Sequence, residues 1–271
     1  TITVTPSFTN DGLSCEGTVR TYTVTVNPTA TVNTVSNQVI CNGSASAAVN
    51  FSTTATGGTV TYAWTNSNTT IGLSASGSGN IASFTATNNG TAPVTATITV
   101  TPTFTNAGVS CQGTAQTFTI TVNPTATVNA ISNQTVCNGA AVTAVNFATT
   151  ATGGTVTYNW TNNNTSFGLA ASGTGNIASF NAINNTNAPQ IATINVTPVF
   201  SNGGVSCTGT ATSFTITVNP EMIVNAISSQ VLCNNASTTA VNFASPTTGG
   251  TIVYNWTNSN TAIGLAASGS G

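Results

Sequence analysis

The sequence has almost no charge, and this scarcity excludes several classes of function. Its 271 residues include one Lys or Arg, three Asp or Glu and no His. Proteins that bind nucleic acids or anionic membrane surfaces do so through clusters of Lys and Arg. With Arg20 as the only basic side chain, neither nucleic acid nor an anionic membrane is an expected partner.

Long apolar runs and helical patterns are also absent. No apolar stretch approaches the roughly 18 residues that a membrane-spanning helix requires, so we expect no membrane insertion by this part of the chain. Apolar residues instead alternate with polar ones, and Val60, Tyr62 and Trp64 share one face of an extended segment. This period of two runs through the whole sequence and predicts an all-β fold.

What the sequence does contain is a repeat of 96 residues. A period of this length corresponds to a whole domain rather than one turn of a solenoid. Two complete repeats, 29–124 and 125–220, lie between the last part of one repeat, 1–28, and the first part of another, 221–271. The residues that recur at this interval are Pro28, Pro124 and Pro220; Trp64, Trp160 and Trp256; Cys41, Cys137 and Cys233; and Cys15, Cys111 and Cys207.

Within one repeat, short alternating segments are separated by Gly, Asn and Ser. About seven antiparallel strands in a domain of this size predict an immunoglobulin-like β-sandwich, with Trp64 filling the space between its two sheets. The outward positions are mainly Thr, which suits an exposed strand. The expected strands are 31–41 in two pieces, 45–54, 59–65, 69–75, 80–87, 94–104 and 114–122.

Three sequence blocks extend this interpretation to a family. "VCNG" at 136–139, "YNW" at 158–160 and "TVNP" at 217–220 resemble the PKD-like, immunoglobulin-like repeats of very large Bacteroidota surface proteins. That group includes gliding-motility adhesins and other cargo of type IX secretion. The resemblance covers the whole sequence and implies surface display, an extended stalk and adhesion. It names no ligand and no catalytic residue, and the charged turn residues of the family are replaced here by "TNSNTT" and "TNNNTS".

The groups that enzymes and metal sites require are missing. General acid–base catalysis needs titratable side chains, but the acids Asp11, Glu16 and Glu221 are replaced by uncharged residues in the other repeats. The junctions 26–33 and 122–129 contain no carboxylate for calcium. Neither C-x-x-C pairs nor His are present for zinc. We therefore expect no enzyme activity and no cofactor.

The six cysteines at fixed repeat positions predict disulfides and an extracellular or cell-surface location. We favour pairing within each repeat, which leaves the first and last cysteine to pair outside the sequence or across chains. A competing scheme links cysteines that lie 26 residues apart. The favoured pairs are Cys41–Cys111 and Cys137–Cys207, with Cys15 and Cys233 left over; the competing pairs are Cys15–Cys41, Cys111–Cys137 and Cys207–Cys233.

An Asn-rich loop at 66–70 recurs in each repeat and is the one candidate ligand site. Its amides could hydrogen-bond a neutral sugar, and the alternative is a polar turn between strands. Rows such as Thr117, Thr119 and Thr121 are compatible with an ice-binding surface, but ordinary solvated Thr is the simpler interpretation. The loop residues are Asn66, Asn68, Asn162, Asn164, Asn258 and Asn260.

Together these features predict a structural or adhesive repeat region of a secreted bacterial cell-surface protein, forming a stalk or fibre. A surface with so little charge lacks the repulsion that keeps proteins apart, so we expect self-association, lateral or end to end. The alternative is a neutral-glycan-binding module within such a stalk. We expect residues 1–28 and 221–271 to be completed by neighbouring residues of a longer chain; the alternative is head-to-tail assembly between chains.

Overall fold

The computed structural model describes all 271 residues, which divide into two compact units, Thr1–Asn123 and Pro124–Gly271. Both units are built from strands, and the helices are two single turns of 3-10 helix, η1 (Thr69–Ile71) and η2 (Thr261–Ile263). The strands of the first unit are β1 (Ile2–Val4), β2 (Ser7–Asn10), β3 (Leu13–Glu16), β4 (Arg20–Tyr22), β5 (Gln38–Cys41), β6 (Thr59–Asn66), β7 (Ser76–Ser78), β8 (Val94–Asn106), β9 (Val109–Gln112) and β10 (Gln116–Asn123). Those of the second are β11 (Gln134–Cys137), β12 (Ala141–Val142), β13 (Thr155–Asn162), β14 (Ser172–Thr174), β15 (Phe180–Asn181), β16 (Gln190–Asn202), β17 (Val205–Thr208), β18 (Thr212–Asn219), β19 (Asn255–Thr257) and β20 (Ser268–Ser270).

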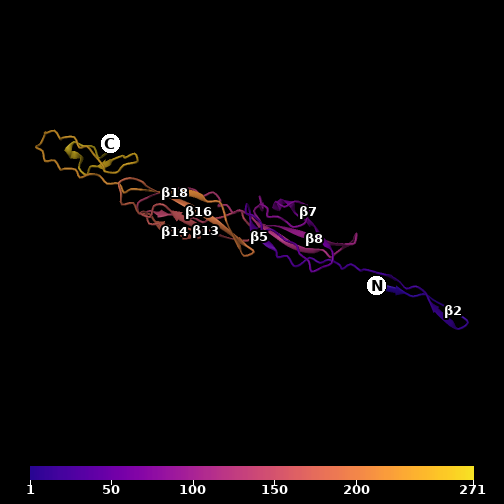
Figure 1. Cartoon of the computed structure of the whole chain (residues 1–271). Helices are drawn as coiled ribbons and strands as arrows, with labels where there is room; N and C mark the ends of the chain where they lie inside the picture. The colour runs from indigo at the N-terminus through magenta and orange to yellow at the C-terminus, as the bar shows by residue number, and fades with distance from the viewer. The chain divides into compact units, whose positions relative to one another are not determined.

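The main sheet of the first repeat has the order β5-β10-β8-β6-β7, and β9 pairs with the far end of β8. Of these strands, β5, β7 and β8 are labelled in Figure 1. The second repeat has the same order in β11-β18-β16-β13-β14, with β17 on β16. The predicted all-β, tandem immunoglobulin-like sandwich is therefore confirmed. One detail differs, because β5 runs parallel to β10 rather than antiparallel.

The predicted alternation of Thr and apolar residues places Thr on the outer face of this sheet. In β8, Ile98 and Val100 are fully buried, whereas Thr99 between them points outward. Thr99 lies opposite Thr65 of β6 on one side and Thr117 of β10 on the other, so hydroxyl-bearing residues meet across three strands. The strands thus bury one face in the core and present a row of uncharged hydroxyls to solvent.

The second layer of the sandwich is less regular than predicted. The expected strands at 45–54 and 80–87 pair only through isolated bridges, such as Val49 with Ile81. Side chains supply other bonds in place of a ladder, and Asn80 Oδ1 accepts from the Phe51 amide at 2.9 Å. The layer still covers the sheet, because Val49, Phe51 and Ile81 are all buried in the core.

The expected strand at 69–75 is wrong, because residues 69–71 form η1. Asn68 is its N-cap, with Oδ1 accepting from the Thr70 amide, and Gly72 ends the turn with a φ of 93°. A Cβ atom is strained in that left-handed conformation, which makes Gly the suitable residue. The N-cap Asn68 and the C-cap Gly72 lie only four residues apart, so the segment forms a single helical turn, which buries Ile71.

Each sandwich has a Trp packed flat against a Gly of the neighbouring edge strand. Trp64 is 7% exposed, and a Cβ atom added to Gly77 would overlap its indole ring. Trp160 and Gly173 make the same contact in the second repeat. The indole Nε1 atoms of both Trp residues are buried and have no hydrogen-bond partner. The Trp therefore acts as a space-filling core residue, as the sequence predicted.

Residues 221–271 leave side chains exposed that the complete repeats bury. Ile71 is fully buried, but its equivalent Ile263 is 70% exposed; Leu73 is 8% exposed, but its equivalent Leu265 is 50% exposed. The cause is that residues 221–271 include no counterparts of β8 and β10, the strands that cover these positions in a complete repeat.

Candidate functional site

The Asn-rich loop is held together by its own side chains. Asn66 is buried, and its Nδ2 donates to the Leu73 carbonyl at 2.9 Å while its Oδ1 accepts from the Asn68 amide at 3.0 Å. Asn68 Oδ1 in turn accepts from both the amide and the hydroxyl of Thr70, at 3.1 and 2.7 Å. These two amides shape the turn between β6 and η1.

The same network recurs in the other repeats. Asn162 donates to the Leu169 carbonyl at 3.1 Å, and Asn164 Oδ1 accepts from the amide and hydroxyl of Ser166. Asn258 and Asn260 repeat both roles at the third loop. The amide oxygens of all six predicted loop residues therefore accept hydrogen bonds within the turn. The Nδ2 atoms of Asn66, Asn162, Asn164 and Asn258 donate to neighbouring groups as well.

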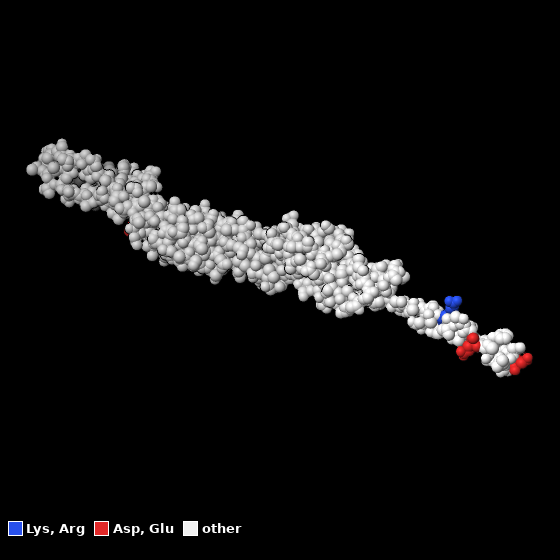
Figure 2. Space-filling model, in the orientation of Figure 1, with Lys and Arg blue, Asp and Glu red and all other residues white.

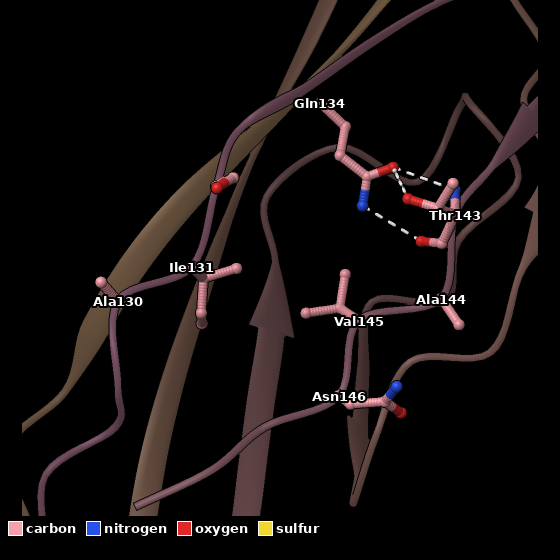
Figure 3. Close-up of a pocket in the computed structure, with 8 residues that line it drawn as sticks. Ala130, Ile131, Gln134, Thr143, Ala144, Val145 and Asn146 are labelled. Carbon is pink, nitrogen blue, oxygen red and sulfur yellow. Dashed lines mark hydrogen bonds between the residues drawn. The ribbon is translucent and has the colours of Figure 1, made fainter.

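A second repeated feature, which the sequence analysis missed, is a Gln that bridges the two layers. Gln134 Nε2 donates to the Thr143 carbonyl at 3.0 Å, and Gln134 Oε1 accepts from the Thr143 amide at 2.9 Å and its hydroxyl at 2.7 Å (Figure 3). Gln38 and Gln230 bond Ala47 and Thr239 in the same way. The sequence contains the pattern that could have revealed this bridge, because Gln38, Gln134 and Gln230 recur at the interval of 96 residues.

A shallow groove lies beside this bridge and is lined by small apolar and uncharged polar side chains. Ala130, Ile131 and Val145 line it together with the Gln134 amide (Figure 3). The first repeat has the same groove next to Gln38. The lining beside Gln134 includes the hydroxyls of Ser132 and Thr143 but no side chain that titrates as a general acid or base near neutral pH.

Charged groups are confined to the segments outside the two complete repeats. Arg20, Asp11 and Glu16 are exposed in residues 1–28, and Glu221 follows the second repeat. In the view of Figure 2 the coloured atoms gather at the N-terminal segment and the rest of the surface is almost entirely white. No group of three or more potential metal-ligating residues occurs, and no helix is long and apolar enough to cross a membrane.

Among the titratable side chains, two partly buried tyrosines that pack against the core have a raised pKa. Tyr62 and Tyr158 pack against Phe51 and Phe147, with ring centroids 5.5 Å apart in both pairs. Burial against these rings raises the pKa of both phenols above the ordinary value, because the charged phenolate is less well solvated there. Desolvation against the core is the only cause of both shifts, and no neighbouring charge contributes to either.

The cysteines of one repeat lie at opposite ends of its sheet. Cys41 ends β5 and is in register with Asn123, the last residue of β10. Cys111 lies on β9 opposite Phe104, near the other end of β8. Val94 at the start of β8 pairs with Val122, next to the residue opposite Cys41, whereas Phe104 lies opposite Cys111. The two cysteines are therefore separated by the length of β8 from Val94 to Phe104, about ten residues or roughly 33 Å at 3.3 Å per residue.

This separation rules out the disulfides that the sequence analysis favoured. A disulfide requires Cα atoms within about 7 Å of each other, so neither Cys41–Cys111 nor Cys137–Cys207 can form in the folded repeat. In the structure Cys15, Cys111, Cys137 and Cys233 have free thiols, so every favoured pair and every competing pair includes a free cysteine. Cys41 and Cys207 are each in a disulfide. The competing scheme of 26-residue links is absent as well. Sequence reasoning placed Cys41 at the end of a strand and Cys111 in the turn of the final hairpin, where the structure has β9. It did not recognise how far apart a long strand places the two cysteines.

Comparisons with known proteins give only distant structural neighbours. No family model matches the chain, and no curated protein matches it. The insect immune protein hemolin aligns with 14% identity over 80% of this chain and 56% of the hemolin chain, at a TM-score of 0.31. The tandem Ig repeats of Dlar align with 13% identity over 70% of this chain and 99% of that chain, at 0.21. The human desmocollin-1 ectodomain aligns with 11% identity over 79% of this chain and 46% of that chain, at 0.25.

Proposed function

We propose that this chain is a structural and adhesive repeat region of a secreted bacterial cell-surface protein, and that its repeats form a stalk or fibre that associates through its uncharged faces. The resemblance of its sequence blocks to Bacteroidota surface repeats supports the cellular setting. The disulfide-bonded state of Cys41 and Cys207 supports an oxidising, extracellular location. Catalysis has no basis in the grooves or loops described above.

The observation that carries this proposal is the outer face of the main sheet. In the first repeat, Thr61, Thr97 and Thr117 are exposed on three neighbouring strands of this face. In the second repeat the position equivalent to Thr95 is Ile191, which is 57% exposed. Uncharged hydroxyls and scattered apolar side chains give a surface with no electrostatic barrier to contact with a second copy.

Adding charge to this face tests the proposal. The variant carrying Thr61→Lys, Thr97→Lys and Thr117→Lys should remain monomeric in sedimentation velocity at low salt, where the wild-type chain associates with increasing concentration. Salt near 0.5 M should restore association, because it screens the added charges.

The matched control carries the same three added charges on exposed loop residues, as Thr54→Lys, Ser74→Lys and Asn89→Lys. It should associate as the wild type does. A wild-type chain that stays monomeric at every concentration, or a control that loses association to the same extent, would show that the Thr face is not the adhesive surface.

A neutral-glycan-binding module is the second candidate, and one detail of the Asn loop favours it. The Oδ1 atoms of Asn68 and Asn260 accept hydrogen bonds within the turn. Their Nδ2 atoms lie at equivalent positions in two repeats and could each donate to a sugar hydroxyl. Binding of the chain to a glycan array, lost in the double variant Asn68→Asp and Asn260→Asp, would support this function. Asp retains the capping oxygen and removes the donor, so the turn itself should be preserved. Uniform absence of binding would reject it.

A further inference from the structure

Four Asn residues of the chain are followed directly by Gly, and this order of residues is chemically fragile. The backbone amide of a following Gly can approach the Asn side chain without obstruction by a Cβ atom. Asn is accordingly one of the thermolabile residues of proteins. The structure holds the four side chains differently, so they should not react alike. The four are Asn42, Asn89, Asn138 and Asn202.

Three of these residues are engaged by the fold. Asn42 Oδ1 accepts from the Asn88 amide at 2.8 Å, and Asn138 Oδ1 accepts from the Asn184 amide at 2.8 Å. In both turns the amide of the following Gly donates to a backbone carbonyl, at 2.8 and 2.7 Å. Asn202 takes part in an interaction of its own. At Asn42 and Asn138, attack on the side chain therefore requires the loss of a hydrogen bond that holds two segments of the repeat together.

Asn89 is the exception, because its side chain is exposed and has no hydrogen-bond partner in the protein. Its neighbour Asn88 is only 3% exposed and anchors the loop. Asn88 Nδ2 donates to the carbonyls of Ala92 and Val122, at 2.9 and 2.7 Å. Asn88 Oδ1 accepts from the Gly90 amide at 2.9 Å. The loop is thus held from one side by Asn88, while the Asn89 side chain is free to turn toward the Gly90 nitrogen.

The second repeat contains the same loop with one chemical difference. Asn184 repeats the role of Asn88, since its Nδ2 donates to two carbonyls and its Oδ1 accepts from the Thr186 amide at 2.9 Å. Asn185 is exposed like Asn89, but the residue after it is Thr186 instead of Gly. A β-branched side chain crowds the amide nitrogen that would have to attack. The two loops therefore differ at the position that controls the reaction.

We propose that Asn89 is a site of spontaneous deamidation, through which the first repeat acquires a carboxylate that the equivalent loop of the second repeat does not. The Gly90 nitrogen attacks the side-chain carbonyl carbon of Asn89, and the new C–N bond closes a succinimide ring. Asn89 Nδ2 leaves as ammonia, which carries away the proton of the Gly90 amide. Water then opens the ring at either carbonyl and gives Asp or an isoaspartyl linkage. One water is consumed and one ammonia is released, and no oxidant or reductant takes part.

The reaction changes the first repeat in two ways. It adds a negative charge to a chain that has three Asp or Glu side chains. An isoaspartyl linkage also inserts a backbone carbon between Asn89 and Gly90, which displaces the Gly90 amide from Asn88 Oδ1 and disturbs the anchor on Val122 near the end of β10. The inference goes beyond the proposed function, because the chemistry proceeds whether or not the chain associates with anything.

Incubation of the folded wild-type chain in mildly alkaline buffer, followed by peptide mapping at intervals, tests the assignment. The peptide that contains Asn89 should gain about 1 Da and separate into Asp and isoaspartyl forms. Asn42 and Asn138 should convert at least about tenfold more slowly, because a hydrogen bond must break first. Asn185 should be slower by about the same factor, because Thr186 crowds the attacking nitrogen. An unchanged Asn89, or any of the other three converting as fast as Asn89, would overturn the proposal.

Exchanging the residue after Asn between the two loops separates the chemistry from the fold. Gly90→Thr should slow conversion at Asn89 at least about tenfold, and Thr186→Gly should raise conversion at Asn185 to about the rate of wild-type Asn89. The φ of Gly90 is not in the left-handed region, so Thr can adopt its conformation. A Thr186→Gly variant in which Asn185 stays unreactive would contradict the proposed chemistry. If either variant fails to fold, the comparison within the wild-type chain still decides.

Discussion

At the scale of single residues, the repeats rest on close contacts that leave no space for an added atom. The Trp64 and Gly77 pair shows this most clearly, since the indole covers the position where a side chain on Gly77 would begin. The pairing explains why the Gly-rich segment after the Asn loop is an edge strand and not a flexible linker.

Replacing Gly77 with Ala should therefore destabilise the first repeat by about 1–3 kcal/mol, the usual range for overpacking a filled core. Thermal or urea unfolding followed by Trp fluorescence would measure the loss. Ser78→Ala, at an exposed residue of the same edge strand, is a suitable control and should change the free energy of unfolding by less than about 0.5 kcal/mol. A loss below about 0.5 kcal/mol for Gly77→Ala would mean that Trp64 can move aside at little cost.

At the scale of elements, side chains replace part of the backbone ladder in the second layer. The Gln38 amide pairs with the Ala47 backbone at 3.1 Å in both directions, as a strand residue would. Gln38→Ala should cost about 1 kcal/mol, because two hydrogen bonds at a partly exposed site are exchanged for bonds to water. Gln116, a partly exposed residue of β10, provides the control, and Gln116→Ala should change the free energy of unfolding by less than 0.5 kcal/mol. If the two substitutions lowered the free energy of unfolding equally, the Gln38 bridge would not be a specific source of stability.

The elements also show what the sequence could predict and why the rest was missed. Period-two alternation located β6, β8 and β10, since one buried face enforces the pattern. It failed at 69–75, where an Asn cap and a left-handed Gly decide the local conformation. It also failed for the cysteines, because spacing along the chain does not reveal that β8 carries the hairpin to the far end of the sheet.

At the scale of the whole molecule, the scarcity of charge governs how stability should respond to pH. The four charged side chains lie on exposed residues outside the complete repeats. Stability changes with pH only where the folded and unfolded states bind different numbers of protons. We therefore expect the free energy of unfolding to stay constant from about pH 3 to pH 9.

The alkaline side should behave differently, because burial raises the pKa of Tyr62 and Tyr158 in the folded state. An unfolded Tyr ionises near pH 10, below the pKa of these tyrosines in the folded state. The contribution of the two phenols to the free energy of unfolding is therefore complete below about pH 10, and it is lost as the pH rises through their folded pKa. Urea unfolding at pH 3, 5, 7, 9 and 10.5 should give a flat profile followed by a decline. The double variant Tyr62→Phe and Tyr158→Phe should show less of that decline. A fall in stability between pH 3 and pH 9, or an unchanged alkaline decline in the double variant, would contradict this account.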